Sequence, residues 1–498
     1  MNQDVPTFAI PVGLNYKLGI ADALPSSHNI SQFLASNAST FTPSNKTVRI
    51  NVSSGAFLDV KNAVLEFDLK NNTSTDPVRL DGSAACIIKS IRVRGGDSST
   101  IEYLEDYNLL DCILDQYASS DGAARIKCAQ KGSPRFQDET AAFDEVSGNS
   151  GAAALAATAV ATAYETGIQA TVVNTFTGNT GQSTIKLSGI GGIGYDQRLS
   201  DTLNTGITRH YSFGLKGAFF NPSTAKLLAP NTPFQLEIEL DAAANCLVNL
   251  AGANAVDYQA ENFELHIPSV MINDVNYMSM LNQRLASGIA WKGNSYDHFT
   301  GTTSAGAGKD VVQISARARS LKGLMTILRK QSKISSDNDF KLSKRTIQYV
   351  SQYIYRLGSV NMPQDFVTLS TDTTAGGSAS GARLPIASTD NLNISEAYNQ
   401  ALRLFGSLNI SNASMQVGQE SFAQSENLNN NGTGILSVNL SSFSDGSVNS
   451  GMNTLNNMPV SIEFTKTAAC NVTTQVDTFA VQELIMMRDG NGVLSSMS

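Results

Sequence analysis

Apolar and polar side chains alternate with a period of two in many short stretches of this chain. The clearest stretch covers residues 234–241, where four apolar residues alternate with Gln235, Glu237, Glu239 and Asp241. Such alternation is typical of strands with one buried and one wet face, as in antiparallel sandwiches. Comparable alternation or short apolar runs predict further strands near residues 48–52, 65–69, 91–93, 211–215, 263–267, 312–314, 323–328, 347–355, 436–440, 460–464 and 479–487.

Two segments instead repeat apolar residues at helical spacing. Residues 101–118 carry such a stripe, and Ser99 with Glu102 fits a capping box at its start. Residues 395–408 carry a second stripe, with Gly406 near its C-terminal end. The stripes consist of Tyr103, Tyr107, Leu110, Leu114 and Tyr117, and of Tyr398, Leu402, Phe405 and Leu408. The order strands, helix, strands therefore occurs twice, which predicts an all-β chain of two sandwiches or jelly rolls.

Composition distinguishes the segments around these strands. Residues 1–46 contain four prolines and few basic residues, which predicts an extended arm that lies against neighbours and does not bind a genome. Residues 137–206 are rich in Ala, Gly, Thr and Asn, which predicts a long insertion on an outward surface. We therefore expect a first unit at residues 47–280, with this insertion, and a second unit at residues 281–498.

The chain has few charges for its 498 residues. Charged residues make up 16%, against about 25% in typical globular proteins, and the formal net charge is −8. The low charge content predicts that contacts cover much of the surface, and the negative net charge gives no reason to coat nucleic acid. Residues 1–20 show no basic start followed by an apolar run, and no apolar stretch reaches roughly 20 residues, so we expect neither a secretory signal nor a membrane span.

The spacing of cysteine and histidine predicts no metal site. The cysteine number is odd and no CxxC pair occurs, which indicates buried free thiols in a reducing compartment. These cysteines are Cys86, Cys112, Cys128, Cys246 and Cys470. No two histidines are four residues apart, and no HExxH motif occurs. We therefore expect no metal or general-base role for His28, His210, His266 or His298.

Two further patterns resemble ligand sites but lack the required context. Residues 189–194 match GxGxxG, but residues 202–236 contain no Asp or Glu and no helical pattern follows, so we expect a glycine-rich loop. The carboxylates of Glu237, Glu239 and Asp241 are expected on a wet sheet face, although carboxylates from different strands could still form a glycosidase pair. We therefore predict no catalytic residue, no cofactor and no enzyme.

The order of several long segments resembles a known family. They run from FLDVKNAVLEFDLKN at residues 57–71 and IIKSIRVRGGDSSTIEYLEDYNLLDCIL at 87–114, through residues 211–248 and 263–289, to VVQISARARSLKGLMTILRK at 311–330, ISEAYNQALRLFG at 394–406 and DGNGV at 489–493. In this order, the chain from about residue 47 to its end resembles the double jelly-roll major capsid proteins of adenovirus-like, virophage and polinton-like viruses. Residues 137–193 have no clear counterpart in that family.

The resemblance implies both a fold and a function. The fold is two tandem eight-stranded jelly rolls, with a short helix in each and long surface loops. The function is that of a homotrimer with a pseudo-hexagonal outline, which tiles the icosahedral shell of a double-stranded DNA virus. The chain is then expected in the virion, after assembly inside the infected host cell. Its implied partners are other copies of itself, together with penton and minor capsid or cement proteins.

One charged stretch, residues 309–345, has two interpretations. It contains ten basic residues against three acidic ones. The basic residues are Lys309, Arg317, Arg319, Lys322, Arg329, Lys330, Lys333, Lys341, Lys344 and Arg345. They either contact an acidic partner, such as a neighbouring subunit or the inner membrane or genome of a virion, or form a solvated basic face. No aromatic residues interleave as a stacking platform, so we expect no sequence-specific binding of nucleic acid.

Three other functions stay open from the sequence. A bacterial surface-layer protein or tip adhesin would share the Ala, Thr, Asn and Gly composition, but it should also be exported. A minor capsid or spike protein would share the compartment and the fold class, although a length of two jelly rolls favours the major subunit. A β-sandwich carbohydrate-binding surface protein would show exposed aromatic clusters. Aromatic residues make up only 7% of the chain, and Trp291 is the single tryptophan, which argues against that function.

Overall fold

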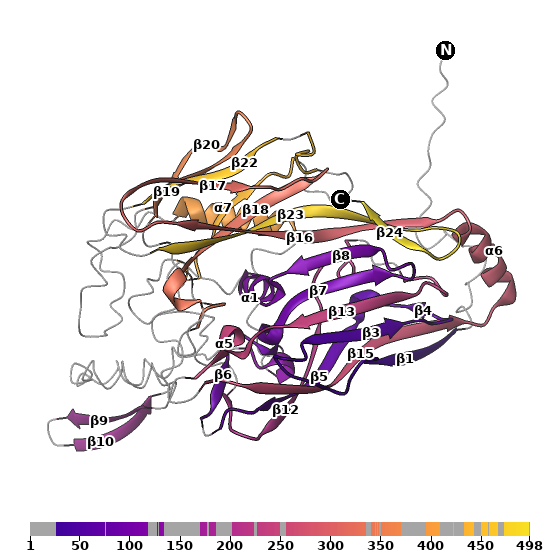
Figure 1. The fold of residues 1–498 in the computed structure, drawn as a ribbon, viewed down its shortest axis with the longest axis horizontal. Coiled ribbons are helices and arrows are strands. Elements are labelled where there is room, and N and C mark those ends of the chain that lie inside the picture. The colour runs from indigo at the N-terminus through magenta and orange to yellow at the C-terminus, as the bar shows by residue number, and fades with distance from the viewer. Residues whose placement is uncertain are drawn as a thin grey trace, which may run out of the picture.

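The computed structural model shows two β-sandwiches that follow one another along the chain (Figure 1). It describes residues 26–74, 76–117, 127, 129–133, 170–176, 179–185, 202–223, 227–249, 255–334, 340–343, 345, 347, 350–369, 395–408, 422, 433–442, 450–456, 458–466 and 473–497. Helix α6 (Val275–Leu285) connects the two sandwiches at one end of the molecule. No helix in these ranges is long and apolar enough to cross a membrane.

The first sandwich contains eight main strands in two antiparallel sheets. In chain order they are β1 (Ser26–Leu34), β3 (Thr47–Val52), β5 (Val64–Asn71), β7 (Ile88–Gly95), β8 (Thr100–Glu105), β12 (Thr208–Gly214), β13 (Phe234–Leu240) and β15 (Tyr258–Ile272). One sheet has the order β1-β15-β5-β12 and the other β3-β13-β7-β8. Numbered by position in the unit, these orders are 1-8-3-6 and 2-7-4-5, which is the connectivity of a jelly roll.

The second sandwich repeats this topology strand for strand. Its strands are β16 (Ile289–Thr303), β17 (Gly308–Ile314), β18 (Leu321–Lys330), β19 (Val350–Leu357), β20 (Val360–Thr368), β21 (Leu436–Asn439), β22 (Val460–Lys466) and β23 (Thr474–Arg488). Its sheets have the orders β16-β23-β18-β21 and β17-β22-β19-β20, again 1-8-3-6 and 2-7-4-5. The predicted fold class, two tandem eight-stranded jelly rolls, is therefore confirmed.

The burial of the strands explains their sequence patterns. Residues 234–240 of β13 alternate between buried and half-buried positions, because one face of the strand lines the core and the other is wet. Residues 321–329 of β18 are all buried. The sheet that contains β18 also contains β16, which lies against β8 of the first unit. A strand covered on both faces loses the alternation and becomes a continuous apolar run.

A helix follows the fifth strand in both units. These helices are α1 (Tyr107–Tyr117), after β8, and α7 (Ser395–Ser407), after β20. The prediction for α7 is confirmed, but the prediction of a helix over residues 101–118 with a capping box was wrong at its start. Residues 100–105 form β8, which pairs with β7. Glu102 does not cap a helix; its carboxylate accepts hydrogen bonds from the backbone N–H groups of Ala218 and Phe219 (2.7 and 2.8 Å).

The structure differs from the expected boundaries at both ends of the first unit. Strand β1 lies within the expected arm, residues 1–46, and supplies the first strand of the jelly roll by pairing with β15 from Ser26↔Ile272 to Leu34↔Glu264. The expected boundary after residue 280 falls inside α6. Because β1 has one open edge and an exposed outer face, it shows little of the apolar alternation that marks the inner strands.

The expected insertion, residues 137–206, is described only in part. It contains the hairpin of β9 (Ala170–Phe176) and β10 (Asn179–Ile185), and β11 (Thr202–Leu203), which pairs with β6 (Val78–Leu80). The glycine-rich residues 189–194 lie outside the described residues. The remaining short elements are β2 (Thr40–Phe41), β4 (Phe57–Leu58), η2 (Val60–Asn62), η3 (Ala84–Ile87), α5 (Ala243–Cys246), β14 (Leu247–Val248), η6 (Gln331–Lys333) and β24 (Leu494–Met497).

Candidate interaction surfaces

A buried carboxylate joins the two jelly rolls. Asp81, in the turn after β6, is only 1% exposed. Its carboxylate accepts hydrogen bonds from the backbone N–H of Lys341 (2.5 Å), the backbone N–H of Leu342 (2.8 Å) and the hydroxyl of Ser343 (2.5 Å), all of the second unit. Lys341 in turn donates its Nζ to the carbonyl of Leu247 (3.1 Å). A buried charge is tolerated when it is fully hydrogen-bonded, so this contact fixes one unit on the other.

The two equivalent helices also meet at this seam. The ring of Tyr117, at the end of α1, stacks on that of Phe405 in α7, with ring centroids 4.9 Å apart. The Tyr117 hydroxyl donates to the carbonyl of Thr433 (2.8 Å). Arg345 is buried, donates to the same carbonyl (3.2 Å) and binds the side chain of Gln116. Burial raises the pKa of the Tyr117 hydroxyl, so it stays a protonated donor at neutral pH.

The histidine of β16 belongs to a structural ion network. His298 is buried between the carboxylates of Asp106 (2.9 Å) and Asp477 (3.2 Å). Arg329 binds Asp477 (2.8 Å) and Lys89 binds Asp106. Burial alone would raise the pKa of Asp477, but Arg329 and His298 outweigh it and bring the pKa to about 2. Protein cations therefore already neutralise both carboxylates.

A second group of histidine and carboxylates lies on the outer face of the β5, β12 and β15 strands. His266 contacts Glu264 (3.0 Å) and Glu66 (3.6 Å), and His210 contacts Asp68 (2.9 Å). The ligand-type atoms of Glu66, Glu264 and His266 lie within 4.8 Å of one another, as do those of the His298 group. Both groups have the donor set of a cation site, but in each the side chains already pair with one another, on the sheet surface for Glu66, Glu264 and His266 and in the interior for His298.

The carboxylates singled out in β13 have different surroundings. Glu237 lies on the wet face among Arg49, Arg92 and Arg94, with N–O distances of 3.4 to 3.7 Å. Glu239 pairs with Lys46 on the same face, and this ion pair lowers the pKa of Glu239. The expectation for Asp241 was wrong. This residue follows the strand, is buried, and accepts hydrogen bonds from Asn108 and Asn245 (both 2.9 Å) where the chain turns into α5.

The three described cysteines fit the prediction of buried free thiols. Cys86, Cys112 and Cys246 are free and buried, and burial raises the pKa of the Cys246 thiol. Cys128 and Cys470 lie outside the described residues.

Burial divides the basic stretch at residues 309–345. Four of its ten cations are buried inside the protein, namely Lys322, Arg329, Lys341 and Arg345. They bind internal partners; Lys322, for example, contacts Glu483 (3.2 Å). Arg317 and Arg319 are exposed and Lys330 is half-buried. Neither interpretation therefore holds for the whole stretch, because Lys322 and Arg329 lie on the buried strand β18, and Lys341 and Arg345 are buried at the seam between the two units.

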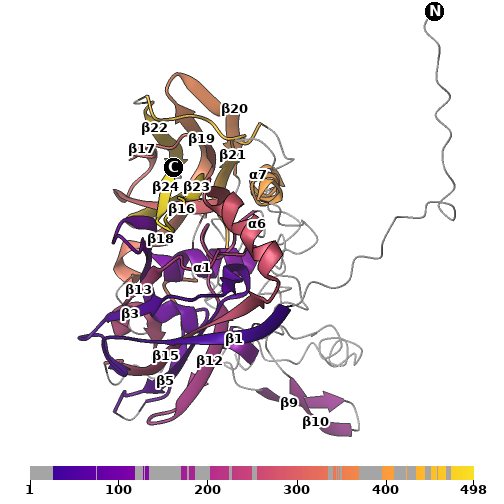
Figure 2. The ribbon, with the colours of Figure 1, turned by 90° about the vertical axis from the view of Figure 1, so that its right-hand side faces the viewer.

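Several exposed apolar side chains of the first unit lie on β1 and on α6, the helix that follows β15. Figures 1 and 2 place α6 and β1 together at one end of the molecule. All eleven residues of α6 are at least partly exposed, with Val275 82% and Met280 61% exposed. Ile30 and Leu34 on β1 are 62% and 59% exposed. Exposed apolar clusters of this kind mark contact surfaces.

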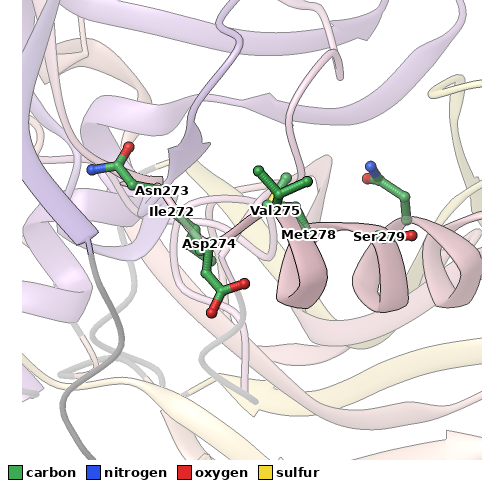
Figure 3. Close-up of a pocket in the computed structure, with 7 residues that line it drawn as sticks. Ile272, Asn273, Asp274, Val275, Met278 and Ser279 are labelled. Carbon is green, nitrogen blue, oxygen red and sulfur yellow. The ribbon is translucent and has the colours of Figure 1, made fainter.

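A shallow depression of about 530 Å³ lies along α6 (Figure 3). Asp274 caps the helix by accepting hydrogen bonds from the N–H groups of Asn276 (2.9 Å) and Tyr277 (3.0 Å). The depression is lined by Ile272, Asn273, Asp274, Val275, Met278, Ser279 and Asn282. The lining combines apolar side chains with amide groups, the Ser279 hydroxyl and the Asp274 carboxylate that caps the helix.

Sequence reasoning missed both elements of this end. Asp274 as an N-cap, followed by Val275, Met278 and Leu281 at helical spacing, and Gly288 after the last turn, are signals that could have identified α6. For β1 the signal is weaker, because polar residues dominate the strand.

No protein-family model and no curated protein sequence matches the chain. Solved structures share its fold over nearly its whole length. They include the capsid of the PBCV-1 virus (9% identity, TM-score 0.53, 96% of this chain and 98% of that chain covered) and the Faustovirus major capsid protein (9%, 0.56, 96% and 92%). They also include the mavirus major capsid protein, with 9% identity, a TM-score of 0.51, and coverage of 100% of this chain and 95% of that chain. At this identity the likeness establishes the double jelly-roll fold.

Proposed function

We propose that the chain is the major capsid protein of a double-stranded DNA virus. The observation that carries the proposal is the pair of complete jelly rolls, held as one body by a buried seam and matched over 92% or more of the length of three capsid proteins. Three copies with two jelly rolls each form a homotrimer of pseudo-hexagonal outline, which tiles an icosahedral shell.

The surfaces of the chain support an assembly role. The apolar end formed by β1 and α6 offers contacts to neighbouring copies or to penton and minor capsid or cement proteins. Among the described residues of the 309–345 stretch, the exposed cations Arg317 and Arg319, and Lys309, which also pairs with Glu463, are candidates for contact with an inner membrane or genome. The chain would then be located in the virion, after assembly inside the infected host cell.

The mass of the purified protein tests this proposal. Light scattering is expected to give three times 52.9 kDa at moderate salt. A monomer at every salt concentration and protein concentration would overturn the proposal and would favour the carbohydrate-binding alternative. A minor capsid or spike protein would instead be found in purified virions at a small fraction of the copies of the most abundant protein.

A further inference from the structure

Strand β1 offers an open sheet edge. In the described part of the chain, Ser26–Leu34 pairs with β15 alone. The N–H of Ala35 donates to the carbonyl of Phe263 (3.0 Å), which continues the same register. Odd-numbered residues of β1 therefore bond β15, and even-numbered residues direct their N–H and C=O groups to the open edge. The strand contains no Pro, Lys, Asp or Glu, so it lacks the residues that usually protect an edge.

The outer face of this edge is apolar at two even-numbered positions. Ile30 and Leu34 are mostly exposed, while Phe33 on the opposite face packs against the core. A strand added to the edge would therefore find backbone partners along β1 and two apolar side chains, Ile30 and Leu34, among the polar side chains of that face.

The first 25 residues contain a segment with the matching pattern. Every second residue from Phe8 to Ile20 is apolar, and those between are small or polar apart from Pro11. The apolar residues are Phe8, Ile10, Val12, Leu14, Tyr16, Leu18 and Ile20. Seven such positions in a row are the pattern of a strand with one buried face. In the sequence, five residues separate the end of the segment from Ser26, the first residue of β1.

We propose that residues 8–20 of one copy add as an antiparallel strand to the open edge of β1 in a neighbouring copy. The proposal rests on the assembly of copies proposed above. When even-numbered residues of the segment lie opposite even-numbered residues of β1, all seven apolar side chains share the face of Ile30 and Leu34. Pro11 is odd-numbered, so its missing N–H points away from β1 and costs no hydrogen bond.

A neighbouring copy suits this strand better than the same copy. Folded back on its own β1, the segment would leave its apolar row exposed at a new edge. Exchange between copies brings a second molecule over that row and over the exposed Val275 and Met280 of α6. Residues 21–25, which connect the segment to β1, can span about 17 Å when extended, so the accepting edge must lie within about that distance of the donor's Ser26. Each copy then donates one strand and accepts one, as closed symmetry requires.

Photo-crosslinking of the full-length assembled protein tests this proposal. A benzoylphenylalanine in place of Ile30 is introduced, and equal amounts of ¹⁴N- and ¹⁵N-labelled protein are mixed before assembly and irradiated. Mass spectrometry is expected to find cross-linked peptides that join Ile30 of one isotope to residues 1–25 of the other. The same probe in place of Val311, which is 53% exposed on the edge strand β17, is expected to give no link to residues 1–25.

A matched pair of variants tests the alternation itself. Leu14→Lys is expected to lower the cross-link yield about tenfold, because it removes one buried leucine side chain. Asn15→Lys, on the opposite face, is expected to leave the yield within about twofold of the parent, as for an exposed substitution. Links found only within a single isotope, links only to other residues, or no link in particles that light scattering shows to be assembled would overturn the strand exchange alone. A monomer would overturn the proposed function as well.

Discussion

Removal of the Asp81 carboxylate is the most informative perturbation of the seam. Asp81→Ala leaves two backbone N–H groups and one hydroxyl of the second unit without their acceptor. Each buried polar group left unsatisfied costs about 1–3 kcal/mol, so the variant should lose at least about 3 kcal/mol of unfolding free energy. A domain has roughly 5–15 kcal/mol in total, so this loss is large. Asp81→Asn keeps one acceptor oxygen and should lose about half as much.

Urea unfolding followed by the fluorescence of Trp291 measures this loss, because the single tryptophan is buried in β16. Asp97→Ala is the matched control, since its carboxylate also accepts a backbone hydrogen bond, from Ser99, but is exposed. We expect the control to stay within about 0.5 kcal/mol of the parent. An Asp81→Ala variant equally close to the parent would refute the assignment of Asp81 as a stabilising contact between the jelly rolls.

Three further outcomes follow from the geometry. The pKa of Asp477 is depressed to about 2 in the folded chain, so its contribution to stability is complete above its unfolded pKa near 4 and is lost as the pH falls from 4 to 2. This loss, about 2–3 kcal/mol in the free energy of unfolding, is measured by acid titration at fixed urea and should vanish in Asp477→Asn. Gly293→Ala places a Cβ 2.6–2.7 Å from the backbone of Ala218 and should lower the free energy of unfolding by about 1–3 kcal/mol. Gly55→Ala is the control, because its Cβ meets nothing within 4 Å. Equal melting temperatures of the two variants would contradict the close approach of the two units. Tyr117→Phe loses one hydrogen bond, about 1 kcal/mol, but Tyr117→Ala also loses the stacked ring and should cost about 3–5 kcal/mol in urea unfolding; similar losses would show that the ring contact is unimportant.

The strands with one wet face could be predicted from the sequence, because burial of only one face requires apolar and polar residues to alternate along the strand. Residues 234–240 show this directly. The helical spacing of residues 101–118 was misleading at its start, since Tyr103 lies on β8, half-exposed, under the guanidinium of Arg92 (4.6 Å). In a short strand, the spacing of one aromatic residue in the sequence cannot distinguish a strand from the first turn of a helix.

The interaction surfaces could be predicted far less well, because they depend on contacts between distant residues. Asp81 and Ser343 are 262 positions apart, and nothing near either residue indicates the other. The basic stretch was misjudged for the same reason: the internal acceptors of Arg329 and Lys322 are Asp477 and Glu483, far along the chain. Edge strand β1 was not predicted, because its outer face is mostly polar and shows no apolar alternation.

Electron cryo-microscopy of the purified full-length protein tests the central claim most directly. Two-dimensional averages should show a particle with threefold symmetry and six lobes, since each of three copies contributes two jelly rolls of the same topology. Averages that show only an isolated two-lobed particle, at all concentrations and salt conditions tried, would contradict the claim that this double jelly roll is built to form a capsomer.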